Sequence, residues 1–213
     1  DFSKTKLNDI GKFAFHNCKS VKTVKLPATI EKMGHEIEEV TPKTGEENDN
    51  APKVTYTENV FSCCDKLENI FVDQANSSFK DLDGVLFTKD GKKLIRYPNA
   101  KPAVHYDIPA GVEVIASEAF RQSNTGSSLL ETVSFPESLK EIESIAFRYA
   151  NLKSLKLPAN VKFGNCAFDL CKNLETVEIT EGVVEISEYM FWRCEKFSDV
   201  KFPASLKKIG KCA

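Results

Sequence analysis

The amino-acid sequence predicts a solenoid of about seven stacked coils, with a parallel β-sheet along one face and short turns or 3₁₀ helices along the other. Three observations predict this fold: a motif that recurs along the chain, a nearly regular spacing between its phenylalanines, and an alternation of apolar residues inside each copy. A unit of this size cannot bury its apolar side alone. Stacked units share one continuous core, so we expect an elongated molecule in which each coil contacts its neighbours.

The recurring motif has the form A-F-x-x-C-x-x-L-x-x-V-x-L-P-x-x-V-x-x-I-G. It begins at Ala14, Ala146 and Ala167, and again at Met190 with methionine in place of alanine. Its anchoring phenylalanines are Phe15, Phe61, Phe120, Phe147, Phe168 and Phe191, and the last four are separated by 27, 21 and 23 residues. Leucine-rich repeats have periods of about 20–29 residues. The spacing therefore predicts a leucine-rich-repeat solenoid.

Each column of the motif predicts a local structure. Residues 21–26 and 174–179 end in an apolar alternation of period two, which indicates a short strand with one buried face. A proline follows such strands, as at Pro27 and Pro158, and ends them because it lacks an N–H donor. Apolar pairs spaced by three residues then predict a tight turn that buries both side chains: Ile30/Met33, Val112/Ile115, Leu139/Ile142, Val183/Ile186 and Leu206/Ile209. The A-F-x-x-C segment predicts a single helical or 3₁₀ turn.

We expect one solenoid domain over residues 1–213, with departures from the period at a few places. Residues 35–59 are acidic, with few apolar side chains, and predict a flexible surface insertion. Residues 73–109 predict a long variant repeat, in which two apolar runs flank Asp90-Gly91, a strong hairpin signal. Residues 123–128 predict a shorter loop. Ala213 fits the first position of a further repeat, so we expect the last repeat to be incomplete.

Composition and motifs exclude several classes of function. The formal net charge of -2 lacks the basic excess that a nucleic-acid-binding surface needs, and no apolar run approaches the roughly 20 residues that span a bilayer. No phosphate-binding loop or nucleophile elbow occurs, and the 3 histidines form no metal-ligand pattern. We therefore expect no catalytic residue, no cofactor and no metal site. Asn76-Ser77-Ser78 fits the acceptor sequence for N-glycosylation, which matters only in a secreted protein of a glycosylating cell.

The cysteines follow the repeat. Cys18, Cys64, Cys171 and Cys194 occupy the position three after the repeat phenylalanine, where other copies have Ser123 and Ala150. A column that accepts Cys, Ser and Ala indicates a small buried side chain rather than a metal ligand or a redox group. A disulfide between neighbouring coils stays open as an alternative.

Two columns of the predicted sheet face point away from the core, on either side of the central buried residue of each strand. The first is Thr23, Asn69, Thr132, Ser154, Thr176 and Asp199, and the second is Lys25, Phe71, Ser134, Lys156, Glu178 and Lys201. Solenoids commonly bind partners through such a face, yet short polar residues also keep an exposed sheet soluble. Phe71, an aromatic side chain among polar neighbours, favours binding unless the adjacent hairpin covers it.

The recurring motif resembles that of the BspA-like leucine-rich repeat family, and residues 73–98 look like the long variant repeat common in that family. The residues that carry this second likeness are Asn76, Asp83-Gly84-Val85-Leu86 and Leu94-Ile95-x-Tyr97-Pro98. The resemblance covers nearly the whole chain apart from residues 35–59. It implies a secreted or surface-displayed protein, and it implies adhesion to host proteins, as found in host-associated bacteria and some parasitic protists.

The expected function is binding without catalysis. The twelve column residues and the variable loops form the candidate site for a protein or glycan partner, and the resemblance suggests a host extracellular-matrix or plasma protein. We expect neither a nucleic-acid partner nor direct membrane insertion. A rigid spacer that holds another domain away from a surface, with no ligand of its own, is the alternative.

Overall fold

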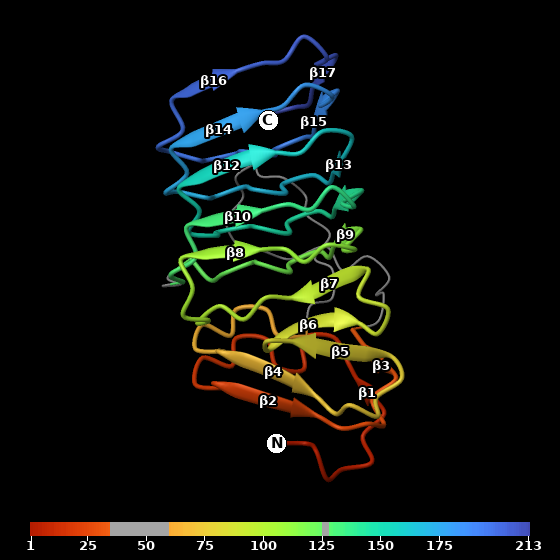
Figure 1. The fold of residues 1–213 in the computed structure, drawn as a ribbon. Helices are drawn as coiled ribbons and strands as arrows, with labels where there is room; N and C mark the ends of the chain where they lie inside the picture. The colour runs from red at the N-terminus through yellow and green to blue at the C-terminus, as the bar shows by residue number, and fades with distance from the viewer. Residues whose placement is uncertain (35–59, 125–127) are drawn as a thin grey trace.

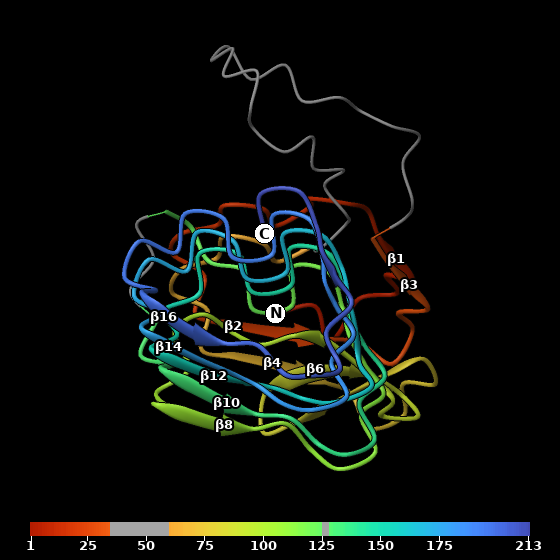
Figure 2. The ribbon, with the colours of Figure 1, turned by 90° about the horizontal axis from the view of Figure 1, so that it is seen from above.

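The computed structural model describes residues 1–34, 60–124 and 128–213 and shows a β-solenoid whose coils stack into an elongated column (Figure 1). Viewed along the column, the coils lie over one another around a common interior (Figure 2). The acidic insertion expected at residues 35–59 lies outside the described residues, as do residues 125–127 of the expected shorter loop.

One row of strands, the front sheet, forms the face that the L-x-x-V-x-L segments predict. Its strands are β2 (Thr23–Leu26), β4 (Asn69–Val72), β8 (His105–Asp107), β10 (Thr132–Ser134), β12 (Ser154–Leu157), β14 (Thr176–Ile179) and β16 (Asp199–Lys201). They pair in parallel in three groups: β2 with β4, β8 with β10, and β14 with both β12 and β16. The alternation predicted from sequence is confirmed in β2, where Val24 and Leu26 are buried while Thr23 and Lys25 are exposed.

A second row, the side sheet, contains strands of two residues: β1 (Asp9–Ile10), β3 (Lys32–Met33), β9 (Val114–Ile115), β11 (Glu141–Ile142), β13 (Lys162–Phe163), β15 (Glu185–Ile186) and β17 (Lys208–Ile209). The sequence predicted only a tight turn here. A ladder forms because the same two backbone positions recur in each coil and pair in parallel with the next, as Ile142 does with Ile115 and Phe163.

The variant repeat inserts antiparallel strands into this stack. β5 (Phe79–Leu82), β6 (Val85–Thr88) and β7 (Lys93–Arg96) form a meander, and β7 then joins the side sheet in parallel with β9. The hairpin predicted at Asp90-Gly91 is therefore present, and Gly91 has the positive φ of 78° that its turn requires. β6 also joins two cores, because Leu86 packs with the N-terminal coils whereas Val85 and Phe87 pack with the later ones.

The A-F-x-x-C segments form turns on the face opposite the front sheet, and no helix of any type occurs in residues 1–34, 60–124 and 128–213. The reason is visible in the Phe147 coil, where Ile145 and Tyr149 both have a positive φ, near 55° and 60°, which a right-handed helix excludes. Inside each turn the repeat phenylalanines stack. Phe147 lies between Phe120 and Phe168, with ring centroids 4.4 and 4.9 Å apart.

The cysteine column packs against the same turns. Cys171 and Cys194 are buried, and each thiol donates to the carbonyl of the repeat phenylalanine in the preceding coil, at 3.2 Å to Phe147 and 3.3 Å to Phe168. Burial raises the pKa of Cys171, so its thiol stays protonated and unreactive. The column thus selects a small side chain that fits under the next coil, as the sequence indicated.

Candidate binding surface

The two outward columns predicted from the sequence lie on the front sheet but are not continuous. Within a group the columns run in register, with Ser154 beside Thr176 and Lys156 beside Glu178. The interruption arises because the antiparallel strands β5 and β6 follow β4 in the stack (Figure 1). They separate the four column residues on β2 and β4 from the eight on β10 to β16. These four residues are Thr23, Lys25, Asn69 and Phe71. Phe71 is 41% exposed, so the hairpin does not cover it.

Sequence reasoning missed two members of the columns, both on β8. His105 pairs with Thr132 and Asp107 pairs with Ser134, which places both residues on the outward face beside β10. A signal was available, because Ile108-Pro109 occupies the L-P position of the motif and fixes the register of the residues before it. The rest of this strand lacks the usual leucine and valine, so the pattern was not recognised.

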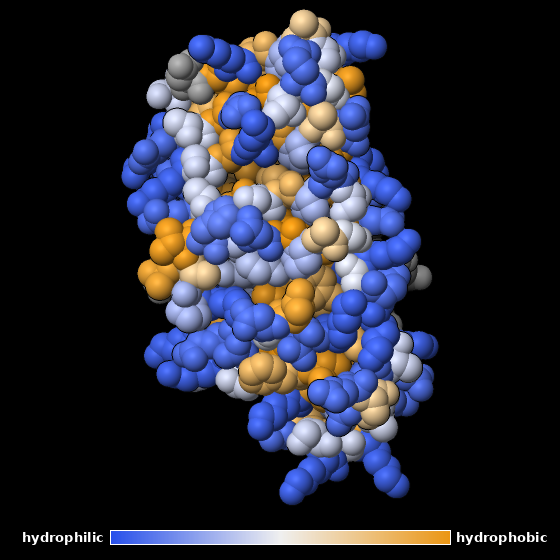
Figure 3. Space-filling view, viewed as in Figure 1, coloured by the Kyte–Doolittle hydropathy of each residue, from blue (hydrophilic) through white to orange (hydrophobic). Residues whose placement is uncertain are grey.

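A shallow hollow of about 520 Å³ lies over the front sheet from β10 to β16. Six residues of the predicted columns line it: Thr132, Ser154, Lys156, Thr176, Glu178 and Lys201. Its floor consists of the buried aliphatic side chains of Val133, Leu155 and Val177. Figure 3 shows this face, where apolar surface is visible between polar and charged side chains. β10 and β12 are not hydrogen-bonded neighbours, so the hollow spans an interruption of the ladder.

The charges of the hollow are partly neutralised. Lys156 and Glu178 form an ion pair of 2.7 Å between exposed side chains of neighbouring strands. Along one rim, Lys153 pairs with Glu131 at 2.6 Å. Lys201 is exposed and forms no ion pair with any side chain that the structure describes. Among the described residues that line the hollow, Lys201 is therefore the charged side chain without an ion-pair partner.

A hydrogen-bonded quartet of polar side chains adjoins the hollow. His105 Nδ1 lies 2.7 Å from the Thr132 hydroxyl, and His105 Nε2 lies 3.0 Å from Asp107 Oδ1 and 3.2 Å from the Ser134 hydroxyl. Hydrogen bonds from His105 and Ser134 lower the pKa of Asp107. The hydroxyl, imidazole and carboxylate resemble an activated nucleophile. However, the backbone N–H groups of paired strands point along the sheet toward neighbouring coils, away from an oxyanion above Thr132.

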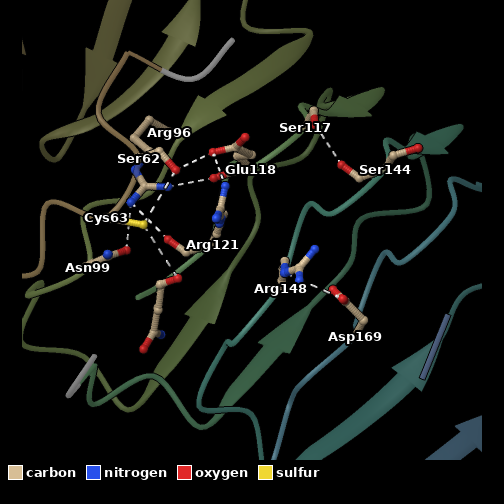
Figure 4. Close-up of polar contacts among 11 residues, drawn as sticks. Ser62, Cys63, Arg96, Asn99, Ser117, Glu118, Arg121, Ser144, Arg148 and Asp169 are labelled. Atoms are coloured by element: carbon tan, nitrogen blue, oxygen red, sulfur yellow. Dashed lines mark hydrogen bonds and ion pairs between the residues drawn. The ribbon is translucent and has the colours of Figure 1, made fainter. Parts of the chain in front are cut away.

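The other titratable cluster is buried in the turns (Figure 4). Arg96 is fully buried and donates to the backbone carbonyls of Glu118, at 2.6 Å, and Arg121, at 3.1 Å, and to Asn99 Oδ1, at 2.8 Å. The Glu118 carboxylate is also fully buried, accepts a hydrogen bond from the Ser62 hydroxyl and pairs with Arg121 at 3.1 Å. These groups hold neighbouring coils together and leave no polar surface for a ligand.

Two coils further along, Arg148 and Asp169 form a second buried pair, with 3.5 Å between Nε and Oδ2 (Figure 4). Burial raises the pKa of Asp169 to about 7, and this effect outweighs the lowering by Arg148 and Arg121. Asp169 is 0% exposed, so its unusual pKa reflects packing rather than a site open to substrate.

Two further findings concern metal sites and membrane-spanning helices in the residues that the structure describes. In those residues, no group of three or more His, Cys, Asp or Glu side chains is arranged to hold a metal ion. The same stretch of chain contains no helix of the length and hydropathy that crossing a bilayer requires.

Comparison with solved structures supports the fold. The pneumococcal vaccine antigen PcpA is 23% identical, with a TM-score of 0.56 over 98% of this chain and 55% of its own. A leucine rich cell surface protein from Faecalibacterium prausnitzii A2-165 is 22% identical, with a TM-score of 0.59 over 97% of this chain and 52% of its own. The chain thus spans about half the length of these proteins. At these identities the likeness shows the fold alone.

Comparison with curated protein sequences found no match. A family match is extensive, however. Residues 2–89 and 97–213 match the BspA type Leucine rich repeat region, in 6 copies. This match includes the Phe15 coil, the coils of the front-sheet hollow and most of the variant repeat. The chain therefore belongs to the BspA-type leucine-rich repeat family.

Proposed function

We propose that the chain is a non-enzymatic protein-binding module of a secreted or surface-displayed protein, and that it binds its partner through the front sheet between β8 and β16. One observation carries this proposal: the hollow lies on the columns of outward residues that packing leaves free to vary. A hollow with an apolar floor and a polar, charged rim has the composition of a protein-binding surface. Adhesion to host material is the specific form of binding that the family suggests.

The proposed location has separate support. A structure of the same fold is named a leucine rich cell surface protein, and another is a vaccine antigen. A similar placement of this chain at a surface is part of the proposal.

The absence of catalysis is proposed from the position of the titratable groups. The group with the clearest upward pKa shift among the carboxylates, Asp169, is closed off from solvent. The exposed His105 quartet has its neighbours in hydrogen-bond range but stands on an open sheet, where nothing encloses a substrate. Catalysis needs preorganised donors around the reacting atoms, and an exposed strand face supplies few of them.

A binding array tests the proposal against the spacer alternative. The purified chain would be passed over immobilised extracellular-matrix proteins, plasma proteins and glycans, beside a variant with Lys156→Ala and Lys201→Ala. The matched control is Phe71→Ala, on the separate strand β4. We expect saturable binding to a protein that the double variant loses and the control retains. Binding that only Phe71→Ala abolishes would move the site to β2 and β4. A chain that binds nothing would favour the spacer.

A further inference from the structure

The hollow offers hydrogen-bond donors that the protein does not use. The hydroxyls of Ser154 and Thr176 lie on paired positions of β12 and β14, and no hydrogen bond within the described chain engages either side chain. In contrast, the neighbouring hydroxyl of Thr132 is held by His105. Parallel strands are spaced by about 4.8 Å, so the two hydroxyls form a short row of donors across the sheet.

The charge of the hollow adds a direction to this row. Lys156 and Glu178 neutralise each other, whereas Lys201, the next residue along the same column, has no ionic partner in the described chain. In the register of the sheet, Thr176 lies beside Asp199 and Glu178 lies beside Lys201, so the Lys201 ammonium group stands in the column next to the row of hydroxyls. A ligand that complements both features carries hydrogen-bond acceptors along the row and an anionic group that reaches sideways to Lys201.

The lining also distinguishes between classes of anionic ligand. The described side chains around the hollow are aliphatic, hydroxylic or charged, and none of the described residues that line it is aromatic. A sugar ring presents an apolar face that binds best to an aromatic ring, and the hollow has no such platform. A polypeptide in extended conformation presents carbonyl acceptors and side chains that match aliphatic floors and hydroxyl donors.

We infer that the hollow over β10 to β16 takes an extended protein segment that carries a carboxylate, with the segment on the hydroxyls of Ser154 and Thr176 and the carboxylate at Lys201. This inference rests on the proposed function and names the chemistry of the partner.

Nuclear magnetic resonance titration of the labelled chain tests the inference with defined probes. The probes are the peptides (Ser-Glu)4 and (Ser-Lys)4 and the carboxylated sugar sialyllactose, each at millimolar concentration. We expect (Ser-Glu)4 to shift the amide signals of Ser154, Thr176 and Lys201 in a saturable manner. Lys201→Ala should weaken this binding about two- to fivefold, as expected for one exposed ion pair. Lys207→Ala removes the same charge from the same coil outside the hollow and should leave the affinity unchanged.

Several results would overturn the inference. Equal shifts with (Ser-Lys)4, shifts that avoid the hollow, equal effects of Lys201→Ala and Lys207→Ala, or no shift with any peptide would each do so. Shifts with sialyllactose but not with (Ser-Glu)4 would assign the surface to an acidic glycan instead. The array separates this failure from failure of the proposed function. A protein partner whose binding ignores Lys201 overturns only the inference, whereas a chain without any partner overturns both.

Discussion

Replacement of Arg96 by methionine tests how the solenoid keeps its register where the repeat is interrupted. In regular coils, the carbonyl after the repeat phenylalanine accepts a backbone N–H from the preceding coil, as Asp169 does from Tyr149 and Trp192 does from Leu170. The Arg121 carbonyl, at the same position of its coil, accepts from the Arg96 guanidinium, which also donates to the carbonyl of Glu118. A buried side chain of the variant repeat thus serves a carbonyl position that a backbone N–H serves in the regular coils.

The magnitude follows from what Arg96→Met leaves behind. Methionine fills part of the volume, but two buried carbonyls and Asn99 Oδ1 lose a charged donor, and buried Glu118 loses a nearby positive charge. Removal of one partner from a buried ionic network costs about 3–5 kcal/mol. In a domain of this size each kcal/mol lowers the melting temperature by about 2–4 °C, so we expect a loss of about 6–20 °C.

Urea denaturation followed by far-ultraviolet circular dichroism measures the free energy of unfolding of both proteins. Arg193→Met is the matched control, because Arg193 is exposed and its guanidinium lies over the Trp192 ring, 4.3 Å from the ring centroid. That contact is worth about 0.5–1 kcal/mol. The role assigned to the guanidinium is refuted if the free energy of unfolding of Arg96→Met lies within about 1 kcal/mol of that of the unchanged protein. It is also refuted if Arg96→Met is no less stable than Arg193→Met.

Three further substitutions test the packing. Asn76→Asp should lower the free energy of unfolding by about 3–5 kcal/mol in the same assay. The buried Asn76 amide donates hydrogen bonds to three carbonyls, at 2.8–3.2 Å, and a carboxylate has no hydrogen to donate to them. A loss below about 1 kcal/mol would contradict this reasoning. Asp169→Asn should leave the free energy of unfolding unchanged near pH 4 and raise it by up to about 4 kcal/mol at pH 8. The reason is that the raised pKa of buried Asp169 makes the native protein lose stability as the pH rises from about 4 to 7. A difference between the two proteins that does not depend on pH would disprove the role of the Asp169 carboxyl. Phe147→Leu should cost about 2–3 kcal/mol, since it removes two stacked ring contacts, and calorimetry should detect it; an unchanged melting temperature would show that the ring stack contributes nothing.

The sequence predicts most of the regular coils because the repeat encodes them redundantly. Val24 and Leu26 alternate with polar residues, a proline follows, and the same order returns in later coils. Such agreement between propensity, pattern and period leaves few alternative folds. The side sheet was missed because two-residue strands have no alternation of their own and depend on pairing with the next coil.

The buried polar groups could not be predicted in the same way. Arg96 stands at the end of an apolar run, where an arginine normally indicates an exposed strand end, yet it is fully buried. Asn76 matches a glycosylation sequence, but its amide nitrogen is occupied by three carbonyls and is 1% exposed as a residue, so the folded protein does not present it for modification. Arg96 and Asn76 both stabilise the fold by donating hydrogen bonds to carbonyls that are distant in sequence, and no local pattern reveals these partners.

The candidate site could be predicted from the sequence in part, less fully than the regular coils and more fully than the buried polar groups. The column positions follow from the strand period, so Ser154, Thr176 and Lys201 were identified as outward residues from sequence. Their identities do not follow from the period, because an outward position is constrained by solubility and binding but not by the core. The repeat pattern specifies the core positions and leaves the outward columns unspecified. For this reason the partner has to be inferred from the side chains of this chain, and substitutions in the columns that leave the fold intact are the measurements that can identify it.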